Sequence, residues 1–420
     1  MRMKKVIVVG INPQYNYPGD IKKWGESNTY YASNLGASFV SRTIIKMFDA
    51  DYVEDIENVK NYKDKYELCV LAFTNHATDW RDVSPYADFI EKLNIPTALF
   101  SLGIQDYTAK SGLVGPLHHS INRILKYVPK TTGYIGVRGF HTASLLYKEG
   151  YNNVIPIGCP TLFNGMSRNL SINKSEQFSR PLFVFHRTFS DISIELVKNV
   201  TMLGQDLFDE AVFTSNFPND QLKIDETSLY SKHLYGKEML DNIKTNGVFY
   251  ADYDRWFNCI GSADFVFGPR LHGNIAGIVQ GVPSLLTARD IRVKEIANFF
   301  KIPVVNYEDI GRQTLKDLYN SLDYSEFNAL YPKRYDNFIG YLTKAGILKY
   351  YHKDENPCEI NFSFDDLQEY RVSINQKIEI MYQRAQNLEK RVLKLERKKL
   401  SNKLPRFINK IKRLYKKQKT

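Results

Sequence analysis

Short apolar runs rich in β-branched residues alternate with segments of helical apolar spacing along most of this chain. The alternation comes in two series, one from residue 4 to residue 163 and one from residue 181 to residue 301, and a polar stretch separates them. Apolar strands that alternate with helices are typical of a parallel sheet covered on both faces. The pattern therefore predicts an α/β protein with two doubly wound, Rossmann-like units.

The chain is long enough for this division. Its 420 residues exceed the ~250–300 at which a single core stops growing. We predict an N-terminal α/β domain over residues 1–165, a linker over 166–180 and a second α/β domain over 181–345. Ligands of such sheets bind beyond the carboxyl ends of the strands, so we expect the site in a cleft between the domains.

The expected elements follow the apolar runs. In the first half we expect strands at 4–10, 67–73, 96–105, 134–139 and 153–163, and helices at 33–48, 87–94, 119–128 and 140–150. In the second half we expect strands at 181–187, 210–215, 247–251, 263–268 and 282–288, and helices at 190–200, 236–243, 253–262, 274–281 and 291–301.

The positive charge is concentrated at the C-terminus. The formal net charge is +11, and residues 376–420 hold sixteen Lys and Arg against three Glu, which is +13. Subtracting +13 from +11 leaves −2 for residues 1–375. A near-neutral body with a basic end argues against a nucleic-acid-binding fold, and we expect no specific nucleic-acid partner.

Two helices are expected at this basic end. Over residues 365–400 an apolar seam spaced alternately four and three apart predicts a coiled coil, which either joins copies of the chain into a homo-oligomer or docks onto the body: Ile374, Ile378, Met381, Ala385, Leu388, Val392 and Leu395. Over residues 401–420 lysines surround an apolar helical face, which suits an anionic membrane surface. Weak RNA binding or a solvated tail are the alternatives for this last segment.

Several classes are disfavoured by missing patterns. The four cysteines lack CxxC spacing, and neither HExxH nor a paired His–carboxylate pattern occurs, so we expect no metal and no disulfide framework. The Gly-containing loops match neither GxGxxG nor the P-loop, which argues against a dinucleotide oxidoreductase. The N-terminus is typical of a buried strand rather than a secretory signal, and no apolar run reaches ~18–20 residues. We therefore expect a cytoplasmic protein, peripheral to the inner face of the membrane where the tail binds it.

The most informative segment is residues 263–292, in which a strand, a polar turn and a helix of small residues follow one another. Arg270 and His272 come after the strand, where open parallel sheets bind ligands, and Gly273 lets a ligand approach the backbone. The helix that begins near Asn274 directs its N-terminal N–H groups at the same place. These features favour an anion beside a proton-transferring histidine. An arginine in a salt bridge beside a core histidine is the alternative.

Five segments in the same order carry a resemblance to a known family. GPRLHGNIAGIVQGVPSLLTARDIRVKEIANFFKIP (268–303) resembles the C-terminal signature of polysaccharide pyruvyltransferases, in which an Arg-x-His-Gly turn precedes a small-residue helix. Four earlier segments resemble the corresponding parts of that family's sequences: SNLGASFV (33–40), SLGIQ (101–105), IGVRGFHTASLLYKEGYNNVIPIGCPTLF (135–163) and PLFVFHRTF (181–189). The resemblance spans roughly residues 5–310, and the two-domain architecture resembles the GT-B arrangement.

Three positions depart from the family pattern. Ala37 stands where Asp or Asn is common, Gly139 where an acidic residue is common, and Cys159 where Asp often stands. These departures bear on the acceptor contacts of the N-terminal half.

The resemblance implies transfer of the enolpyruvyl group of phosphoenolpyruvate to two hydroxyls of a cell-surface glycan sugar, which gives a pyruvate ketal and phosphate. Phosphoenolpyruvate is then the donor substrate, a glycan or lipid-linked sugar is the acceptor, and no cofactor is needed. His272 is the expected acid/base, and Arg270 and the backbone of Leu271 are expected to hold the donor anion. Further expected donor contacts are Arg187, Asn274 and Arg292, and expected acceptor contacts are Asn34 and Gln105.

Two other classes of function remain open. A GT-B glycosyltransferase would use a nucleotide sugar and a carboxylate for the ribose hydroxyls, for which Glu295 or Asp290 is available. Asp290 is as well placed to cap the helix that follows it. A catalytically silent glycan-binding or scaffold protein would tolerate loss of His272. Fold analogy alone does not separate these classes.

Overall fold

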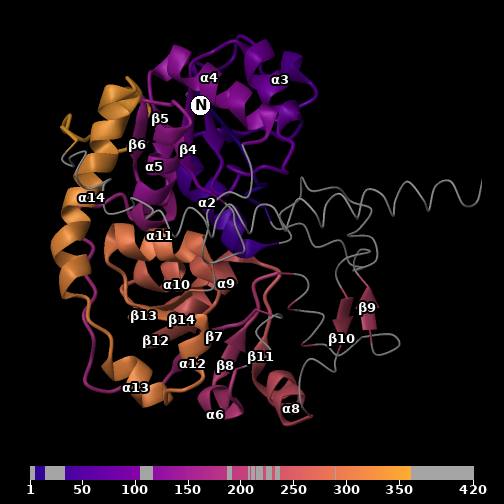
Figure 1. Ribbon diagram of the computed structural model, residues 1–420, viewed down its shortest axis with the longest axis vertical. Coiled ribbons are helices and arrows are strands. Elements are labelled where there is room, and N and C mark those ends of the chain that lie inside the picture. Colours follow the sequence, from indigo (N-terminus) through magenta and orange to yellow (C-terminus); the bar gives the residue numbers. More distant parts are fainter. Residues whose placement is uncertain are drawn as a thin grey trace, which may run out of the picture.

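Two α/β units, one above the other in Figure 1, form the body of the protein. The computed structural model describes residues 5–14, 34–104, 117–186, 192–206, 209, 213, 221–223, 229–231, 237–288 and 290–360. The predicted coiled coil over 365–400 and the basic tail over 401–420 lie outside these residues. Two parallel sheets with flanking helices confirm the predicted α/β class.

The N-terminal unit is built on a six-stranded parallel sheet in the order β2-β1-β3-β4-β5-β6. The strands are β1 (Val6–Val9), β2 (Asp51–Tyr52), β3 (Leu68–Ala72), β4 (Thr97–Leu102), β5 (Ile135–Val137) and β6 (Val154–Pro156). Every residue of these strands except those of β2 is buried. Burial on both faces is the reason that their sequences show no alternation.

Helices cover both faces of this sheet. They are α2 (Leu35–Phe48), α3 (Ser84–Leu93), α4 (His119–Thr132) and α5 (Phe140–Lys148), with a short 3-10 helix η1 (Val59–Asn61). Ile7 and Val9 of β1 belong to a core on the side of α3 and α4, whereas Val6 and Val8 belong to a second core that continues into the other unit. The two units therefore share a hydrophobic core.

The second unit holds another six-stranded parallel sheet, in the order β11-β8-β7-β12-β13-β14. The strands are β7 (Pro181–Val184), β8 (Thr201–Leu203), β11 (Gly247–Val248), β12 (Phe265–Gly268), β13 (Ser284–Ala288) and β14 (Val304–Asn306). The strand order reverses between β7 and β12, which is where open α/β sheets bind ligands.

The helices of the second unit are α6 (Ile194–Val197), α8 (Lys237–Asn246), α9 (Tyr253–Gly261), α10 (Leu271–Ile278), α11 (Ile291–Phe300), α12 (Tyr307–Ile310) and α13 (Leu315–Asn320). A separate antiparallel pair, β9 (Gln221–Lys223) and β10 (Leu229–Ser231), pairs with neither sheet. Residues 164–180 connect the units without helix or strand.

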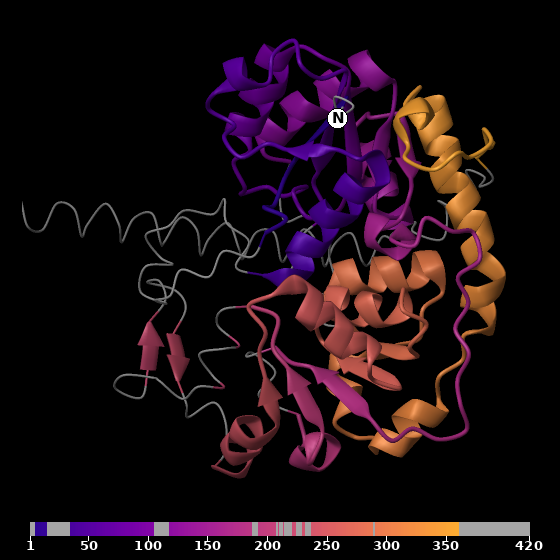
Figure 2. The ribbon, with the colours of Figure 1, turned by 180° about the vertical axis from the view of Figure 1, so that it is seen from behind.

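The long helix α14 (Ser325–Lys344) runs along the side of both units, as Figures 1 and 2 show from opposite directions. Tyr341 Oη donates to Leu99 O of β4 at 3.1 Å. Phe338 stacks on Phe163 with ring centroids 4.8 Å apart; Phe163 ends the 3-10 helix η2 (Pro160–Phe163). The chain then passes η5 (Leu348–Tyr350) beside the N-terminal unit. The helix α14 therefore fixes the second unit against the first.

Most expected elements are present, and a few differ. The expected closing strand over 153–163 is only β6, because Gly158 with φ +78° turns the chain into η2. The expected helix over 190–200 is the single turn α6, followed by the unexpected strand β8. Most of the expected strand over 210–215 lies outside the described residues.

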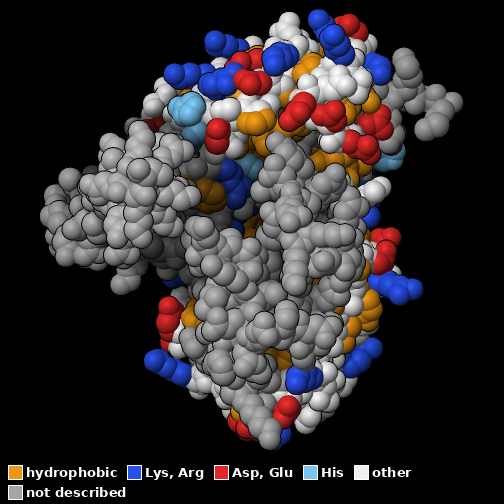
Figure 3. Space-filling model, turned by 90° about the vertical axis from the view of Figure 1, so that its right-hand side faces the viewer, with side chains coloured by type: hydrophobic (Ala, Val, Ile, Leu, Met, Phe, Trp, Pro, Cys, Tyr) orange, Lys and Arg blue, Asp and Glu red, His pale blue; other side chains and the backbone are white. Residues whose placement is uncertain are grey.

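The surface of the described body carries mixed charge. Figure 3 shows Lys/Arg and Asp/Glu side chains interspersed over the visible face of the upper unit. Among the described residues, no helix is both long enough and apolar enough to cross a lipid bilayer.

Candidate active site

The carboxyl ends of strands from both sheets meet at the interface between the units. Arg138 follows β5, Cys159 follows β6, and His272 lies in the first turn of α10 after β12. Cys159 Sγ is 3.7 Å from His272 Nε2, so the two sheet edges are in direct contact. We call Arg138, Cys159, His272 and Arg292 the interdomain site.

Arg138 is a buried arginine that has no counterion among the described residues. Its side chain is fully buried, its Nε has no hydrogen-bond partner, and it makes no ion pair with any described residue. Its backbone N–H donates to Leu102 O at 2.9 Å, which fixes where the side chain begins. Burial lowers the pKa of Arg138, while Cys159 and Glu295 nearby act in the opposite direction. A buried charge without a partner is costly, so this position favours an anionic ligand.

His272 is held between the two units. Its Nε2 faces the Cys159 thiol, and the same sulfur is 3.0 Å from Thr161 Oγ1. Burial is the main cause that lowers the pKa of His272 to about 3, and the positive charges of Arg138 and Arg292 contribute to the same shift. The imidazole is therefore neutral near pH 7 and is able to accept a proton.

Arg292 lies in the first turn of α11. Its Nε donates to Asp290 Oδ2 at 3.1 Å and its Nη2 donates to the same oxygen at 2.5 Å. Asp290 Oδ1 accepts from the backbone N–H groups of Arg292 and Val293, so Asp290 caps α11. The capping role weighed for Asp290 is confirmed, and Arg292 remains partly exposed beside His272.

Arg270 has a different environment from Arg138. Its Nη2 donates to Asp206 Oδ2 at 2.7 Å and also to Asp209 Oδ2, and its Nε donates to Phe185 O at 3.0 Å. Both carboxylates are buried, as is the guanidinium. The salt-bridged alternative weighed for Arg270 is therefore the arrangement in this structure, and the arginine fixes the turn before α10.

The turn itself is held by backbone contacts. Asn274 Nδ2 donates to Gly268 O and to Arg270 O, both at 2.9 Å, so both of its amide hydrogens are used within the turn. Gly268 has φ +126°, and a Cβ there would lie 2.9 Å from Val184 O. Leu271 begins α10, and the first N–H groups of a helix have no partner within it. They are available beside His272.

Of the two predicted acceptor contacts, only Asn34 is described. It caps α2, accepts from Ala37 N at 3.2 Å and accepts from Gln205 Nε2 at 2.9 Å. Leu35 N also donates to Gln205 O at 3.0 Å. Asn34 thus joins the two units, and its side-chain oxygen is occupied. Gln105 and Arg187 lie outside the described residues.

Gly139, one of the departures from the family pattern, makes room for the other unit. A Cβ at this position would lie 2.6 Å from Glu295 Cγ. Glu295 is buried, and its carboxylate accepts from Thr142 N at 2.6 Å and from Thr142 Oγ1 at 2.9 Å. This carboxylate is therefore engaged in an interdomain contact and is not available for ribose hydroxyls.

No group of three or more His, Cys, Asp or Glu side chains within the described part of the chain has the geometry to hold a metal ion.

The family is decided by a match over most of this architecture. The family model "polysaccharide pyruvyl transferase" matches residues 34–291. The chain belongs to the polysaccharide pyruvyl transferase family. The match includes Arg138, Cys159 and His272 and ends one residue before Arg292. Membership of this family supports a transferase activity for the protein. No curated protein sequence matches the chain.

Solved structures show only distant similarity. A putative UDP-N-acetylglucosamine 2-epimerase of Listeria monocytogenes is 10% identical, with a TM-score of 0.45, and the alignment covers 86% of this chain and all of that one. The S. aureus MnaA–UDP structure is 12% identical, with a TM-score of 0.42, and its alignment also covers 86% of this chain and all of that one. An uncharacterized Klebsiella pneumoniae protein is 11% identical, with a TM-score of 0.36, and the alignment covers 72% of this chain and 92% of that one. Similarity at this level carries no functional assignment.

Sequence analysis did not name Arg138 among the candidate site residues. It stands directly after a buried strand, as Arg270 does, so the strand-end signal was present in the sequence. Its lack of a counterion, however, depends on residues far away in sequence and becomes visible only in the structure.

Proposed function

We propose that the protein transfers the enolpyruvyl group of phosphoenolpyruvate to two hydroxyls of one sugar in a glycan or lipid-linked acceptor, forming a pyruvate ketal. The observation that supports this most is Arg138, a buried guanidinium near His272 and Arg292 that pairs with no carboxylate in the described part of the chain. Phosphoenolpyruvate carries a carboxylate and a phosphate, and two arginines with a helix N-terminus suit both groups.

In this proposal Arg138 and Arg292 bind the donor anion together with the N–H groups that begin α10. Arg270 and Asn274, which we expected to touch the donor, act instead as positioning residues, because their donor groups already bind Asp206, Asp209 and backbone carbonyls. Leu271 keeps its expected role through its backbone N–H.

His272 moves the proton in the first step. An acceptor hydroxyl oxygen bonds to C2 of phosphoenolpyruvate while its proton passes to the neutral imidazole and from there to the methylene carbon C3. The product is a tetrahedral carbon that bears a methyl group, the carboxylate, the sugar oxygen and the phosphate. A second hydroxyl then bonds to C2, and the phosphate leaves with the C–O electron pair and the second hydroxyl proton.

Two features of the site favour this order. His272 is neutral before the donor binds, since burial lowers its pKa and the charges of Arg138 and Arg292 act in the same direction. The donor's negative charge offsets those two arginines and therefore raises the pKa of His272, so that the imidazolium formed in the first step is stabilised.

The test is ligand-induced thermal stabilisation with phosphoenolpyruvate and with a panel of nucleotide sugars, on the wild type and Arg138→Gln. A ligand at 100 times its dissociation constant stabilises by about 2.7 kcal/mol. We expect phosphoenolpyruvate to stabilise the wild type and not Arg138→Gln. Phosphate release on adding an acceptor then measures turnover, and we expect His272→Ala to abolish it while donor binding remains.

The other two classes give different results in the same assay. A nucleotide-sugar enzyme would be stabilised by a nucleotide sugar alone, although Glu295 and Asp290 are already engaged by Thr142 and by α11. A silent protein would show no turnover with any acceptor, and His272→Ala would leave its glycan binding unchanged. Either result would overturn the proposal.

A further inference from the structure

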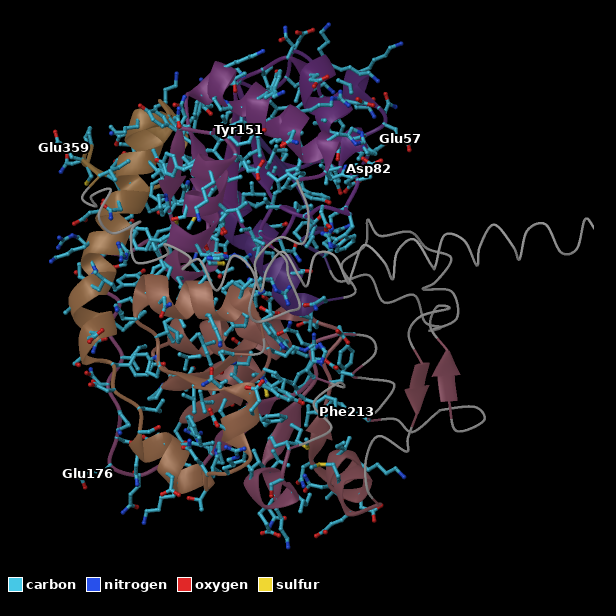
Figure 4. All side chains as sticks on the ribbon, viewed as in Figure 1. Glu57, Asp82, Tyr151, Glu176, Phe213 and Glu359 are labelled. Atoms are coloured by element: carbon cyan, nitrogen blue, oxygen red, sulfur yellow. The ribbon has the colours of Figure 1, made fainter. Side chains whose placement is uncertain are left out.

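The loop between β3 and α3 has features that the donor chemistry does not use. It runs from Phe73 to Val83 and leaves the carboxyl end of β3 next to Arg138. Gly103, directly after β4, separates the two, because a Cβ there would lie 2.6 Å from Thr74 O and 3.0 Å from Arg138 Nε. Asp82, near the end of this loop, lies on the side of the upper unit away from α14 (Figure 4).

His76 in this loop is buried and has an unpartnered ring nitrogen. The residue is 7% exposed, and its Nδ1 has no hydrogen-bond partner among the described residues. The ring stacks on Phe73 with centroids 4.2 Å apart and planes 17° apart, which fixes its orientation. Burial holds its pKa well below the usual value, and the charges of Arg81 and Arg138 act in the same direction. The ring is therefore a neutral hydrogen-bonding group.

A second buried polar atom without a partner lies beside it in sequence. Asn75 Oδ1 is buried and accepts no hydrogen bond from the described part of the chain. Unpartnered buried polar atoms cost about 1–3 kcal/mol each, so two neighbouring ones point to a ligand that supplies hydroxyl groups. A neutral imidazole and an amide oxygen are the uncharged partners that sugar hydroxyls need.

The same loop presents an exposed aromatic face. Trp80 is 49% exposed and is one of two exposed large hydrophobic residues in the described part of the chain. The Arg81 guanidinium carbon lies 5.0 Å from the Trp80 ring centroid. The loop is held in place, because Arg81 N donates to Thr78 Oγ1 at 2.9 Å and His118 N donates to Thr78 O at 2.8 Å. An indole on a fixed loop suits stacking against the apolar face of a pyranose ring.

We propose that residues 74–81 form the carbohydrate subsite for the acceptor: a hexopyranose ring stacks on Trp80, and hydroxyl groups of the same glycan bind His76 and Asn75 on the way to Arg138. The assignment rests on the proposed function for its role in catalysis. Its binding chemistry rests on this loop alone. It differs from the acceptor contacts expected from the sequence, Asn34 and Gln105.

The test uses the full chain and methyl glycosides of glucose, galactose, mannose and N-acetylmannosamine as probes, with binding measured by saturation-transfer NMR and by tryptophan fluorescence. Trp80→Ala removes the stacking face, and Trp80→Phe keeps an aromatic ring. Val304→Ala, at the other exposed hydrophobic residue, is the matched control on β14. His76→Gln tests the polar contact while it keeps a neutral hydrogen-bonding side chain.

We expect at least one glycoside to bind the wild type and Val304→Ala equally, and to bind Trp80→Ala about tenfold more weakly. Trp80→Phe should recover most of the affinity. The proposal is overturned if no glycoside binds the wild type, if Trp80→Ala binds as the wild type does, or if uridine monophosphate rather than a glycoside binds through Trp80.

Thermal stabilisation by phosphoenolpyruvate in the same variants separates this proposal from the proposed function. Trp80→Ala should keep full stabilisation by the donor and lower kcat/KM through a higher acceptor KM, with kcat little changed. Glycoside binding without any donor effect would contradict the pyruvyl transfer and leave the subsite standing. A donor effect with Trp80-independent glycoside binding would contradict the subsite alone.

Discussion

At the scale of single residues, two buried arginines lie at the same interface in opposite electrostatic states. Arg270 is bound by Asp206 and Asp209, whereas Arg138 has no counterion among the described residues. Replacing one partner of a buried ion pair leaves a buried charge uncompensated, which costs about 3–5 kcal/mol. Removing a buried charge that has no partner removes its desolvation cost instead.

The two arginines therefore predict opposite effects on stability. We expect Arg270→Met to lower the free energy of unfolding by about 3–5 kcal/mol. We expect Arg138→Met to leave it unchanged or raise it, while donor binding is lost. Urea unfolding of the two variants beside the wild type measures this. Equal destabilisation by both substitutions would mean that Arg138 has a structural partner.

The contact between Cys159 and His272 leads to a second prediction, which concerns the pKa of His272. The thiol faces His272 Nε2 at 3.7 Å, so Cys159→Asp brings a carboxylate to the imidazole and should raise its pKa from about 3. Cys159→Ser is the matched control and should leave the pKa low. NMR titration of the His272 ring measures the shift. An unchanged pKa in Cys159→Asp would show that the two groups are not in contact in solution.

The same substitution should change the acid stability. The folded-state pKa of His272 is lowered, so the unfolded chain binds the extra proton and stability falls as the pH drops from about 6.5 toward 3. The slope from one such histidine is at most about 1.4 kcal/mol per pH unit. Cys159→Asp should reduce this slope, because its carboxylate favours the imidazolium.

Sequence analysis located the strand-end residues correctly but did not predict which residues they contact. Arg270, His272 and Arg292 follow strands, and the structure has them at the carboxyl edge of the second sheet. Which arginine is paired depends on Asp206 and Asp209, 64 and 61 positions from Arg270. No local pattern carries that information, so a strand-end arginine predicts a site without predicting whether its charge is free.

At the scale of elements, the site depends on how closely α2 of the first unit approaches α10 of the second. Gly36 in the first turn of α2 lies at this contact, and a Cβ there would be 2.8 Å from His272 Cβ and 2.5 Å from Gln205 Nε2. These distances leave no room for a side chain. The glycine thus sets the position of His272 from the other unit.

Gly36→Ala should therefore displace α10 and reduce turnover at least about tenfold, with a stability loss of about 1–3 kcal/mol from overpacking. Gly165→Ala is the control, because a Cβ at Gly165 meets no atom within 4 Å and its φ is not in the left-handed region. Phosphate release and thermal unfolding of both variants measure the two effects. Wild-type turnover in Gly36→Ala would show that the contact is loose.

Two of the strands that sequence analysis missed are short or weakly buried. β14 has exposed, intermediate and exposed residues at the edge of its sheet, and β8 has three residues after a single helical turn. Neither has an apolar run long enough to be distinguished from a loop. The fully buried strands β3, β4, β12 and β13 were all expected, because burial on both faces requires continuous apolar sequence.

At the scale of the whole molecule, the alternation predicted two units but not the extent of their fusion. One hydrophobic core runs from Val6 and Val8 through α2 into the second unit, and α14 covers both. The continuity depends on facing surfaces of distant elements, which periodicity along the chain does not report. Since both sheets share this core, the interdomain site is held by packing as well as by its polar contacts.

The uneven distribution of charge along the chain predicts binding to anionic membranes. Residues 401–420 contain eight Lys and Arg and no Asp or Glu, while residues 1–375 carry a net charge of −2. We expect the full chain to sediment with vesicles containing anionic phosphatidylglycerol and not with neutral phosphatidylcholine vesicles. Each basic residue near an anionic surface contributes about 1 kcal/mol, so deleting 401–420 should abolish sedimentation and raising the salt to 0.5 M should weaken it, with the Debye length shortened from about 10 Å. Vesicle binding that survives the deletion would place the membrane contact on the body and leave the tail without this role.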